Sequence, residues 1–336
     1  MPSRALAVIG VVLASAALAR ADDDAPPDPP PPPRVPLGDR PGGMPGAGGP
    51  PGYNATWYPN QPVGGQPADL GFVRQGLNAG FPVWKSDGDM VLTTVGVRHT
   101  LFFTDAVLPD TGRPFPEQLW NLNLGLSYMH RFENGWTGML MTGVGSPSDK
   151  PFHSVHEVNP SVGAMLRVPV RDGRDAWQFM LMYMPGGAIN FPLPLASYAW
   201  NPTDTFRMNL GLPLSLDWRP TDDLQLTASY VPLLNVNARL TYRLAPGWWA
   251  FGGYEYLNES YLLADRPDNR DRFFVLEQRV VGGLRRQVGR AGTVDVTGGY
   301  SFGRRYGEGR SQWGALRDEV NVDPGPFVGL AAGLRF

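Results

Sequence analysis

Residues 205–218 read TFRMNLGLPLSLDW, and this stretch decides the fold class. Every even position from Phe206 to Trp218 is apolar, and the odd positions are mostly polar or small: Arg207, Asn209, Gly211, Ser215 and Asp217. Alternation with period two is typical of a β-strand whose two faces meet different surroundings. At about 3.3 Å per residue, the apolar face is long enough to cross the wall of a tilted membrane barrel. The stretch therefore predicts one membrane-spanning strand.

The same alternation recurs along the chain from Asp89 to the C-terminus. It predicts strands near 90–104, 119–132, 136–144, 158–170, 176–185, 205–218, 223–232, 234–244, 248–258, 272–287, 293–304 and 325–336. An even number of antiparallel strands is typical of single-chain bacterial outer-membrane barrels. The predicted fold is all-β: a transmembrane, antiparallel, up-and-down β-barrel of about 12 strands over residues 89–336. The joint at Pro232-Leu233 is interpreted as a turn or a bulge.

The lengths of the connections between these strands alternate. Short connections lie at 133–135, 171–173, 220–222, 245–247 and 288–292, and longer ones at 105–118, 145–157, 186–204, 259–271 and 305–324. Outer-membrane barrels have short periplasmic turns and longer outer loops. The pattern predicts that both ends of the barrel segment lie in the periplasm, and only the joint near Pro232 breaks it.

The N-terminus predicts export. Arg4 precedes an apolar run from Ala5 to Leu18, and Ala19-Arg20-Ala21 is a small-x-small cleavage pattern. These features are typical of a secretory signal peptide, predicted over residues 1–21. The apolar run is shorter than the roughly 20 residues that a spanning helix needs.

Residues 22–88 are predicted to be a disordered periplasmic leader. Proline and glycine dominate most of this segment, and such a composition favours extended or flexible chain. The alternative is a ligand for a proline-binding or peptidoglycan-associated partner, anchored by Tyr53, Trp57 and Tyr58.

Composition excludes several classes of protein. The chain has no cysteine, so lipoprotein anchors, disulfides and thiolate metal sites are excluded. Its 29 basic and 31 acidic residues are nearly balanced, so no partner nucleic acid is predicted. No cofactor is predicted either.

The last strand carries a candidate assembly signal. Its alternating apolar residues end in a C-terminal phenylalanine: Val328, Leu330, Ala332, Leu334 and Phe336. This pattern resembles the signal read by the bacterial barrel-assembly machinery. The expected partners are therefore that machinery and outer-membrane lipid, and the sequence leaves the oligomeric state open.

The polar faces of the strands predict the residues that line the barrel interior. The candidates are Arg98, Arg131, Arg167, Arg207, Asp217, Arg239, Arg243, Glu255, Glu277, Arg279, Asp295 and Arg335. If these arginines pair with the acids, the interior is a polar core and the protein is a structural or surface barrel. If water remains, the excess of arginine predicts a narrow passive channel that prefers anions.

Two further classes of function stay open at this point. The segment His153-Ser154-Val155-His156-Glu157 is the best material for a lipid-modifying membrane enzyme or a metal site, but adjacency in a loop does not position a nucleophile against a base. The expectation is that the protein is not an enzyme. A soluble periplasmic β-sandwich that binds a ligand is the other alternative.

Three segments carry a resemblance to a known family. They are LPLASYAWNP (193–202), FRMNLGLP (206–213) and GGYSFGRR (298–305). Residues 191–336 resemble an uncharacterised family of bacterial outer-membrane β-barrels, a domain of unknown function. The resemblance implies the fold and the location in the outer membrane, and it implies no activity.

Overall fold

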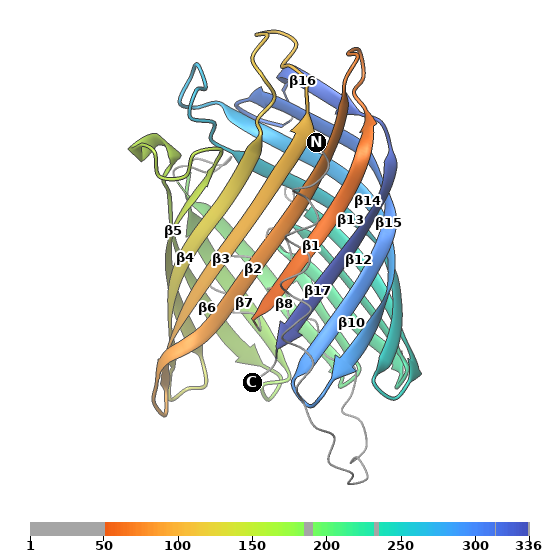
Figure 1. Ribbon diagram of the computed structural model, residues 1–336. Helices are drawn as coiled ribbons and strands as arrows, with labels where there is room; N and C mark the ends of the chain where they lie inside the picture. The colour runs from red at the N-terminus through yellow and green to blue at the C-terminus, as the bar shows by residue number, and fades with distance from the viewer. Residues whose placement is uncertain (1–50, 185–190, 232–234, 313, 335–336) are drawn as a thin grey trace.

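The computed structural model describes residues 51–184, 191–231, 235–312 and 314–334. All strands in these segments belong to one antiparallel sheet, and the sheet closes because β1 pairs with both β2 and β17 (Figure 1). No helix in the described segments is long and apolar enough to cross a membrane. The predicted signal peptide (1–21) and residues 22–50 of the predicted leader lie outside the described residues.

The barrel has sixteen strands. Their bounds are β1 (Gly52–Pro62), β2 (Asp69–Lys85), β3 (Asp89–Thr104), β4 (Gln118–Arg131), β5 (Thr137–Ser148), β6 (Asn159–Val170), β7 (Asp175–Tyr183), β8 (Leu193–Thr203), β9 (Phe206–Gly211), β10 (Leu214–Thr221), β11 (Leu224–Val231), β12 (Asn235–Ala245), β13 (Trp248–Tyr261), β14 (Arg272–Val288), β15 (Gly292–Gly309), β16 (Arg317–Val322) and β17 (Gly325–Leu334). The segments β16 and β17 both pair with β15, one after the other, and so fill a single strand position.

The prediction of about 12 strands is therefore wrong, and so is the prediction that the leader is disordered as far as residue 88. Residues 52–85 form β1 and β2, and residues 193–203 form β8 inside a predicted connection. The prediction of disorder is wrong because it takes glycine as a sign of a flexible chain. A Cβ on Gly71 or Gly76 would lie only 2.2 or 2.5 Å from an asparagine side chain of β1, so these glycines make room for the neighbouring strand.

The stretch 205–218 forms a hairpin of two strands, β9 and β10, so the prediction of one strand there is wrong. Phe206 pairs with Trp218, and Asn209 pairs with Ser215. In this register, even-numbered residues pair with even-numbered ones and odd-numbered with odd-numbered. The alternation of apolar and polar residues therefore continues through the turn without interruption. Gly211 has a φ of 130°, and an added Cβ would lie 2.3 Å from the Ala196 carbonyl oxygen, so the turn requires glycine.

The outer face of the barrel is apolar. Many of its side chains are strongly exposed on strands all around the barrel, among them Leu77, Leu124, Leu140, Val162, Phe179, Leu240, Val280, Val296 and Val328. Such a surface on a closed antiparallel barrel has nowhere to be buried except in lipid. The architecture is that of an outer-membrane β-barrel.

The two ends of the barrel differ in their connections. At one end, here the short-turn end, the strands join through turns such as 171–174 and 246–247, and the two ends of the described chain meet, since Leu334 N–H donates to the Pro51 carbonyl (2.9 Å). The long-loop end carries the connections 105–117, 149–158 and 262–271. The short Leu212–Pro213 turn also lies at this end, and the joint near Pro232 falls outside the described residues.

Strand lengths differ around the barrel. The strands β2, β14 and β15 contain 17, 17 and 18 residues, whereas β9, β10 and β11 contain 6, 8 and 8. Below, β1–β3 and β13–β17 are called the tall side, and β7–β11 the low side. The tall side rises above the low side toward the long-loop end (Figure 1).

Candidate functional site

On the tall side, inner faces that are not neighbours in the sheet touch across the barrel. Phe102 of β3 packs edge-on against Tyr306 of β15, with ring centroids 5.9 Å apart. Phe115, from the 105–117 connection, inserts between them and against Phe273 of β14, at 5.1, 5.3 and 5.7 Å. All four rings are buried. This aromatic cluster fills the interior near the long-loop end of the tall side.

Below the aromatic cluster, three polar contacts cross the interior. Arg74 of β2 pairs with Glu277 of β14 at 3.1 Å, and both side chains are buried. Arg98 of β3 pairs with Glu259 of β13 at 2.6 Å. Arg279 of β14 donates to the Tyr58 hydroxyl of β1 at 2.8 Å. A buried charge is tolerated when it is paired and hydrogen-bonded, so each of these contacts requires the two walls to lie close together.

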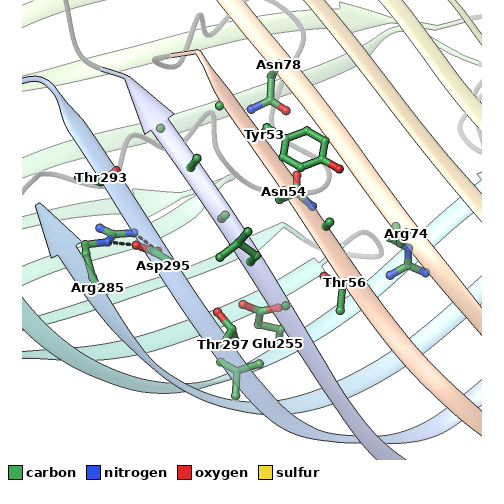
Figure 2. A pocket seen from close by; sticks show the side chains of 18 of the residues that line it. Tyr53, Asn54, Thr56, Arg74, Asn78, Glu255, Arg285, Thr293, Asp295 and Thr297 are labelled. Atoms are coloured by element: carbon green, nitrogen blue, oxygen red, sulfur yellow. Dashed lines mark hydrogen bonds and ion pairs between the residues drawn. The ribbon is translucent and has the colours of Figure 1, made fainter. Parts of the chain in front are cut away.

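Further ion pairs lie along the wall toward the short-turn end. Glu255 pairs with Arg279 and, at 3.6 Å, with Arg239. Arg285 and Asp295 form a bidentate pair at 2.7 and 2.5 Å, drawn as dashed lines in Figure 2. These pairs border a cavity of about 260 Å³, to whose lining β1, β2 and β15 also contribute Asn54, Thr56, Arg74 and Thr297 (Figure 2).

A row of methionines runs along the inner wall from β3, at the edge of the tall side, to β7. Met90, Met129, Met139, Met165 and Met180 are successive register partners on β3 to β7, and Leu195 of β8 continues the row. Their chain neighbours, such as Leu140 and Phe179, are exposed on the outer face, so these side chains point inward. We call them the methionine row.

A polar row lies next to the methionine row, on the side of the short-turn end. Its members are again register partners: Arg131, Thr137, Arg167, Gln178 and Ser197. Neither Arg131 nor Arg167 forms an ion pair with any residue in the described segments, and the same holds for Arg207 on β9. The arginines of this wall therefore differ from the paired arginines of the tall side.

The 105–117 connection is fixed to the tall side by polar contacts as well as by Phe115. Asp318 accepts from the backbone N–H groups of Asp110 and Thr111, both at 2.9 Å, and its own N–H donates to the Asp110 carboxylate at 2.6 Å. Arg113 pairs with Glu308 at 2.6 Å. These contacts hold the connection over the inner face of β15 and β16.

A second connection spans the mouth at the long-loop end. Residues 262–271 leave β13 and contact the β5–β6 connection, although β5 and β13 are eight positions apart in either direction around the sheet. Leu262 N–H donates to the Pro147 carbonyl at 2.7 Å. Ala264 N–H donates to the Asp149 carboxylate at 2.8 Å. We call residues 262–271 the strap.

The strap is fastened by a buried ion pair. Arg266 pairs with Glu157 at 3.1 Å, and both side chains are at most 3% exposed. Arg266 also donates to the His156 carbonyl at 2.8 Å. Burial alone raises the pKa of Glu157, but hydrogen bonds from Ser154 and the charge of Arg266 outweigh it and hold this pKa below its usual value. Glu157 is therefore ionised near neutral pH.

The segment His153–Glu157, considered above as a candidate catalytic or metal site, positions Glu157 for its ion pair with Arg266. Ser154 caps the short 3₁₀ helix Val155–Glu157: its hydroxyl accepts from His156 N–H at 3.1 Å, and its N–H donates to Glu157 at 2.7 Å. In the described segments, no group of three or more His, Asp or Glu side chains is arranged to hold a metal ion.

The residues predicted to line the interior fall into separate groups. Those that line the 260 Å³ cavity are Arg98, Arg239, Glu255, Arg279 and Asp295. Glu277 lies just above it, paired with Arg74. Near the end of β12, Arg243 pairs with Asp223 at 2.5 Å, and in the middle of β10, Asp217 accepts from Gln225 at 2.8 Å. Arg335 lies outside the described residues.

Sequence reasoning missed several charged residues of the interior. Arg74 was assigned to the disordered leader, and Glu259 to a connection. Arg285 has the same parity in β14 as Glu277 and Arg279, so the alternation was sufficient to find it.

The predicted assembly signal lies in β17. Val328 and Leu334 are about half exposed on the outer face, which Leu330 and Ala332 share by alternation. Phe336 lies outside the described residues. Recognition by the assembly machinery stays a prediction.

Comparisons with known proteins found likeness only among solved structures. The chain matches no family model, and a search of curated proteins found no match. An outer membrane channel from Pseudomonas putida F1 is 8% identical with a TM-score of 0.36, over 88% of this chain and 99% of that one. OccK7 from Pseudomonas aeruginosa is 14% identical with a TM-score of 0.35, over 86% and 100%. The β domain of the Bordetella autotransporter Brka is 10% identical with a TM-score of 0.31, over 85% and 99%. At these identities and TM-scores, the likenesses say nothing of what this chain binds or transports.

Proposed function

We propose that this chain is a passive channel of the bacterial outer membrane for small solutes. The observation that carries the proposal is the asymmetry of the interior. The tall side is filled by the aromatic cluster and its ion pairs, whereas inner side chains of β4 and β9, such as Asn123, Arg131 and Arg207, remain exposed. Barrels of about 16 strands are wide enough to leave an aqueous passage. The solute path then runs along β4–β9.

The same asymmetry supports a preference for anions. On the tall side each of Arg74, Arg98 and Arg279 faces a carboxylate, so these charges largely cancel. Arg131 and Arg167 on the open wall have no such partner among the described residues, and basic side chains that line a pore favour anions.

The short-turn end is assigned to the periplasm, because short turns and both chain ends lie on that side in outer-membrane barrels. The expected partners are outer-membrane lipid and the barrel-assembly machinery. We also propose that residues 191–336 belong to the uncharacterised family of bacterial outer-membrane barrels, and that the protein is not an enzyme.

A structural or surface role is the second candidate, and the packed tall side favours it. Conductance of the refolded full chain in a planar bilayer separates the two, with a salt gradient to measure ion preference. Folding is checked beforehand by the gel shift between unheated and boiled samples. Steady conductance with anion preference supports the channel. A folded protein that stays silent overturns the channel and leaves the structural role.

Arg167→Gln tests the origin of the preference. It removes an unpaired charge from the open wall and should lower anion selectivity at nearly unchanged conductance. Arg285→Gln is the matched control, because its charge is balanced by Asp295 on the packed side. Equal effects of the two variants would contradict the assignment of the path to β4–β9.

A further inference from the structure

Within the low side, the β9–β10 hairpin, with strands of 6 and 8 residues, is too short to cross the apolar layer of a membrane. The six residues of β9 extend about 20 Å, and a strand tilt of about 40° reduces this to a height of about 15 Å, against an apolar band of about 25 Å. The tall strands, with 17 or 18 residues, exceed the band by the same calculation. The wall at β9–β10 therefore ends within the lipid layer.

The chemistry of the hairpin tip agrees with this depth. The β9–β10 turn is Leu212–Pro213, and Leu212 is 41% exposed. The 105–117 connection and the strap, by contrast, carry many charges. Only apolar connections are compatible with immersion in the acyl layer.

A small apolar cavity lies directly behind this tip. Its volume is about 150 Å³. Met180, Leu195, Leu212 and Pro213 form its apolar part, and Gln178, Ser197, Asn209 and Ser215 complete its lining. Leu195 and Met180 belong to the methionine row, which continues from here along the inner wall as far as β3. Methionine is flexible and polarizable, so such a surface adapts to alkyl chains of different shape.

The polar row completes the pattern. Arg167 and Gln178 are register partners on β6 and β7, each two residues from a methionine of the row, Met165 or Met180. An alkyl chain on the methionine row therefore places its head group next to an arginine that has no acidic partner among the described residues. A charge-assisted hydrogen bond from arginine favours a carboxylate there.

We infer that the low wall at β9–β10 is a lateral entrance through which a single-chain anionic amphiphile of the fatty-acid class passes from the outer leaflet onto the methionine row. The strap crosses the long-loop end from β13 to the β5–β6 connection, and the 105–117 connection is fixed over β15 and β16, so a side route reaches the interior without passing either connection. The inference rests on the proposed passage function and adds the class of solute.

The depth of the tip is the first test. The chain has no native cysteine, so Leu212→Cys carries a single spin label, and Val155→Cys in the β5–β6 connection is the matched control, since Val155 is 80% exposed. In bilayer nanodiscs, the label at 212 should relax faster with oxygen than with a water-soluble nickel chelate, and the label at 155 should show the reverse. A label at 212 that behaves like the label at 155 overturns the entrance.

Binding is the second test, with dodecanoate and dodecanol titrated into the protein in a neutral detergent. Met180→Gln should weaken both ligands about tenfold, and Arg167→Gln should weaken only dodecanoate, also about tenfold. Met208→Gln is the control, because Met208 lies on the outer face of β9 and should change neither. Absence of saturable binding, or an equal loss in the control, overturns the inference.

The two proposals fail separately. A protein that conducts small ions but binds neither ligand overturns the lateral entrance alone. A silent barrel that binds dodecanoate with the expected variant pattern supports the entrance and overturns the aqueous channel.

Discussion

Phe115 anchors the 105–117 connection, and Phe115→Ala should release it. The ring is 4% exposed and contacts Phe102, Phe273 and Tyr306 at centroid distances of 5.1, 5.7 and 5.3 Å. Truncation of such a buried phenylalanine costs about 3–5 kcal/mol. A loss of about 3 kcal/mol lowers the ratio of docked to undocked connection by about 100-fold.

Hydrogen exchange over residues 105–117 measures this change, and planar-bilayer conductance measures its effect on the path. Exchange should become faster by about that factor, and conductance should become larger or noisier. Val107→Ala is the matched control, because Val107 belongs to the same connection but is 42% exposed. If Phe115→Ala leaves both exchange and conductance as in the parent, the aromatic cluster does not hold the connection, and the polar contacts of Asp318 suffice.

Three further predictions concern the wall and the strap. Glu277→Gln leaves Arg74 buried without its acid and should destabilise the barrel by about 3–5 kcal/mol, read from urea unfolding, whereas additional neutralisation of Arg74 should restore part of the loss. Leu140→Arg should cost about 2–4 kcal/mol because this side chain faces lipid, whereas Met139→Arg, one residue away on the inner face, should fold; equal refolding yields would show that the faces are reversed. The pKa of Glu157 is lowered in the folded strap, so its ionised carboxylate stabilises the strap above the ordinary pKa of 4.5. As pH falls through the lowered pKa this stabilisation should disappear, so the hydrogen-exchange protection factors of residues 262–271, corrected for the intrinsic exchange rate at each pH, should fall only below about pH 4.5. Protection factors that stay constant between pH 7 and 3 would contradict it.

Alternation in the sequence identified most of the wall and its faces. Leu124, Leu126 and Tyr128 are exposed on the outside of β4, as expected from their spacing. The same signal failed at β9 and β10, because alternation reports which face a residue occupies and not the direction of the chain. A turn that preserves parity is therefore invisible to it. Leu212–Pro213 also lacks the Asn-Gly or Asp-Gly pair that marks most tight hairpins. In a turn that lies in lipid, polar side chains would lose their hydration.

Composition was the wrong guide for the first two strands. The composition of residues 22–88 predicts a disordered leader, with Tyr53, Trp57 and Tyr58 as anchors for a partner only in the alternative interpretation. In the structure Trp57 is exposed on the outer face of β1, and Tyr58 is fully buried on the inner face, as alternation alone would have placed them. Glycine and proline lower the propensity for a strand, but pairing with β17 on one side and β2 on the other supplies what local propensity lacks.

The charge of the interior was the part least accessible to sequence. Counting arginines and acids on the inner faces gives an excess of positive charge, but it does not say which of them meet. Arg74 and Glu277 are 203 residues apart and lie on strands that are not neighbours, and they pair because the tall walls approach each other. That approach goes with strand length: the tall strands carry the buried aromatic side chains, which pack in one cluster with aliphatic residues such as Leu108 and Leu263 of the long connections. Arg167 has no acidic partner among the described residues, so the same residue type is neutralised on one side of the barrel and unpaired on the other.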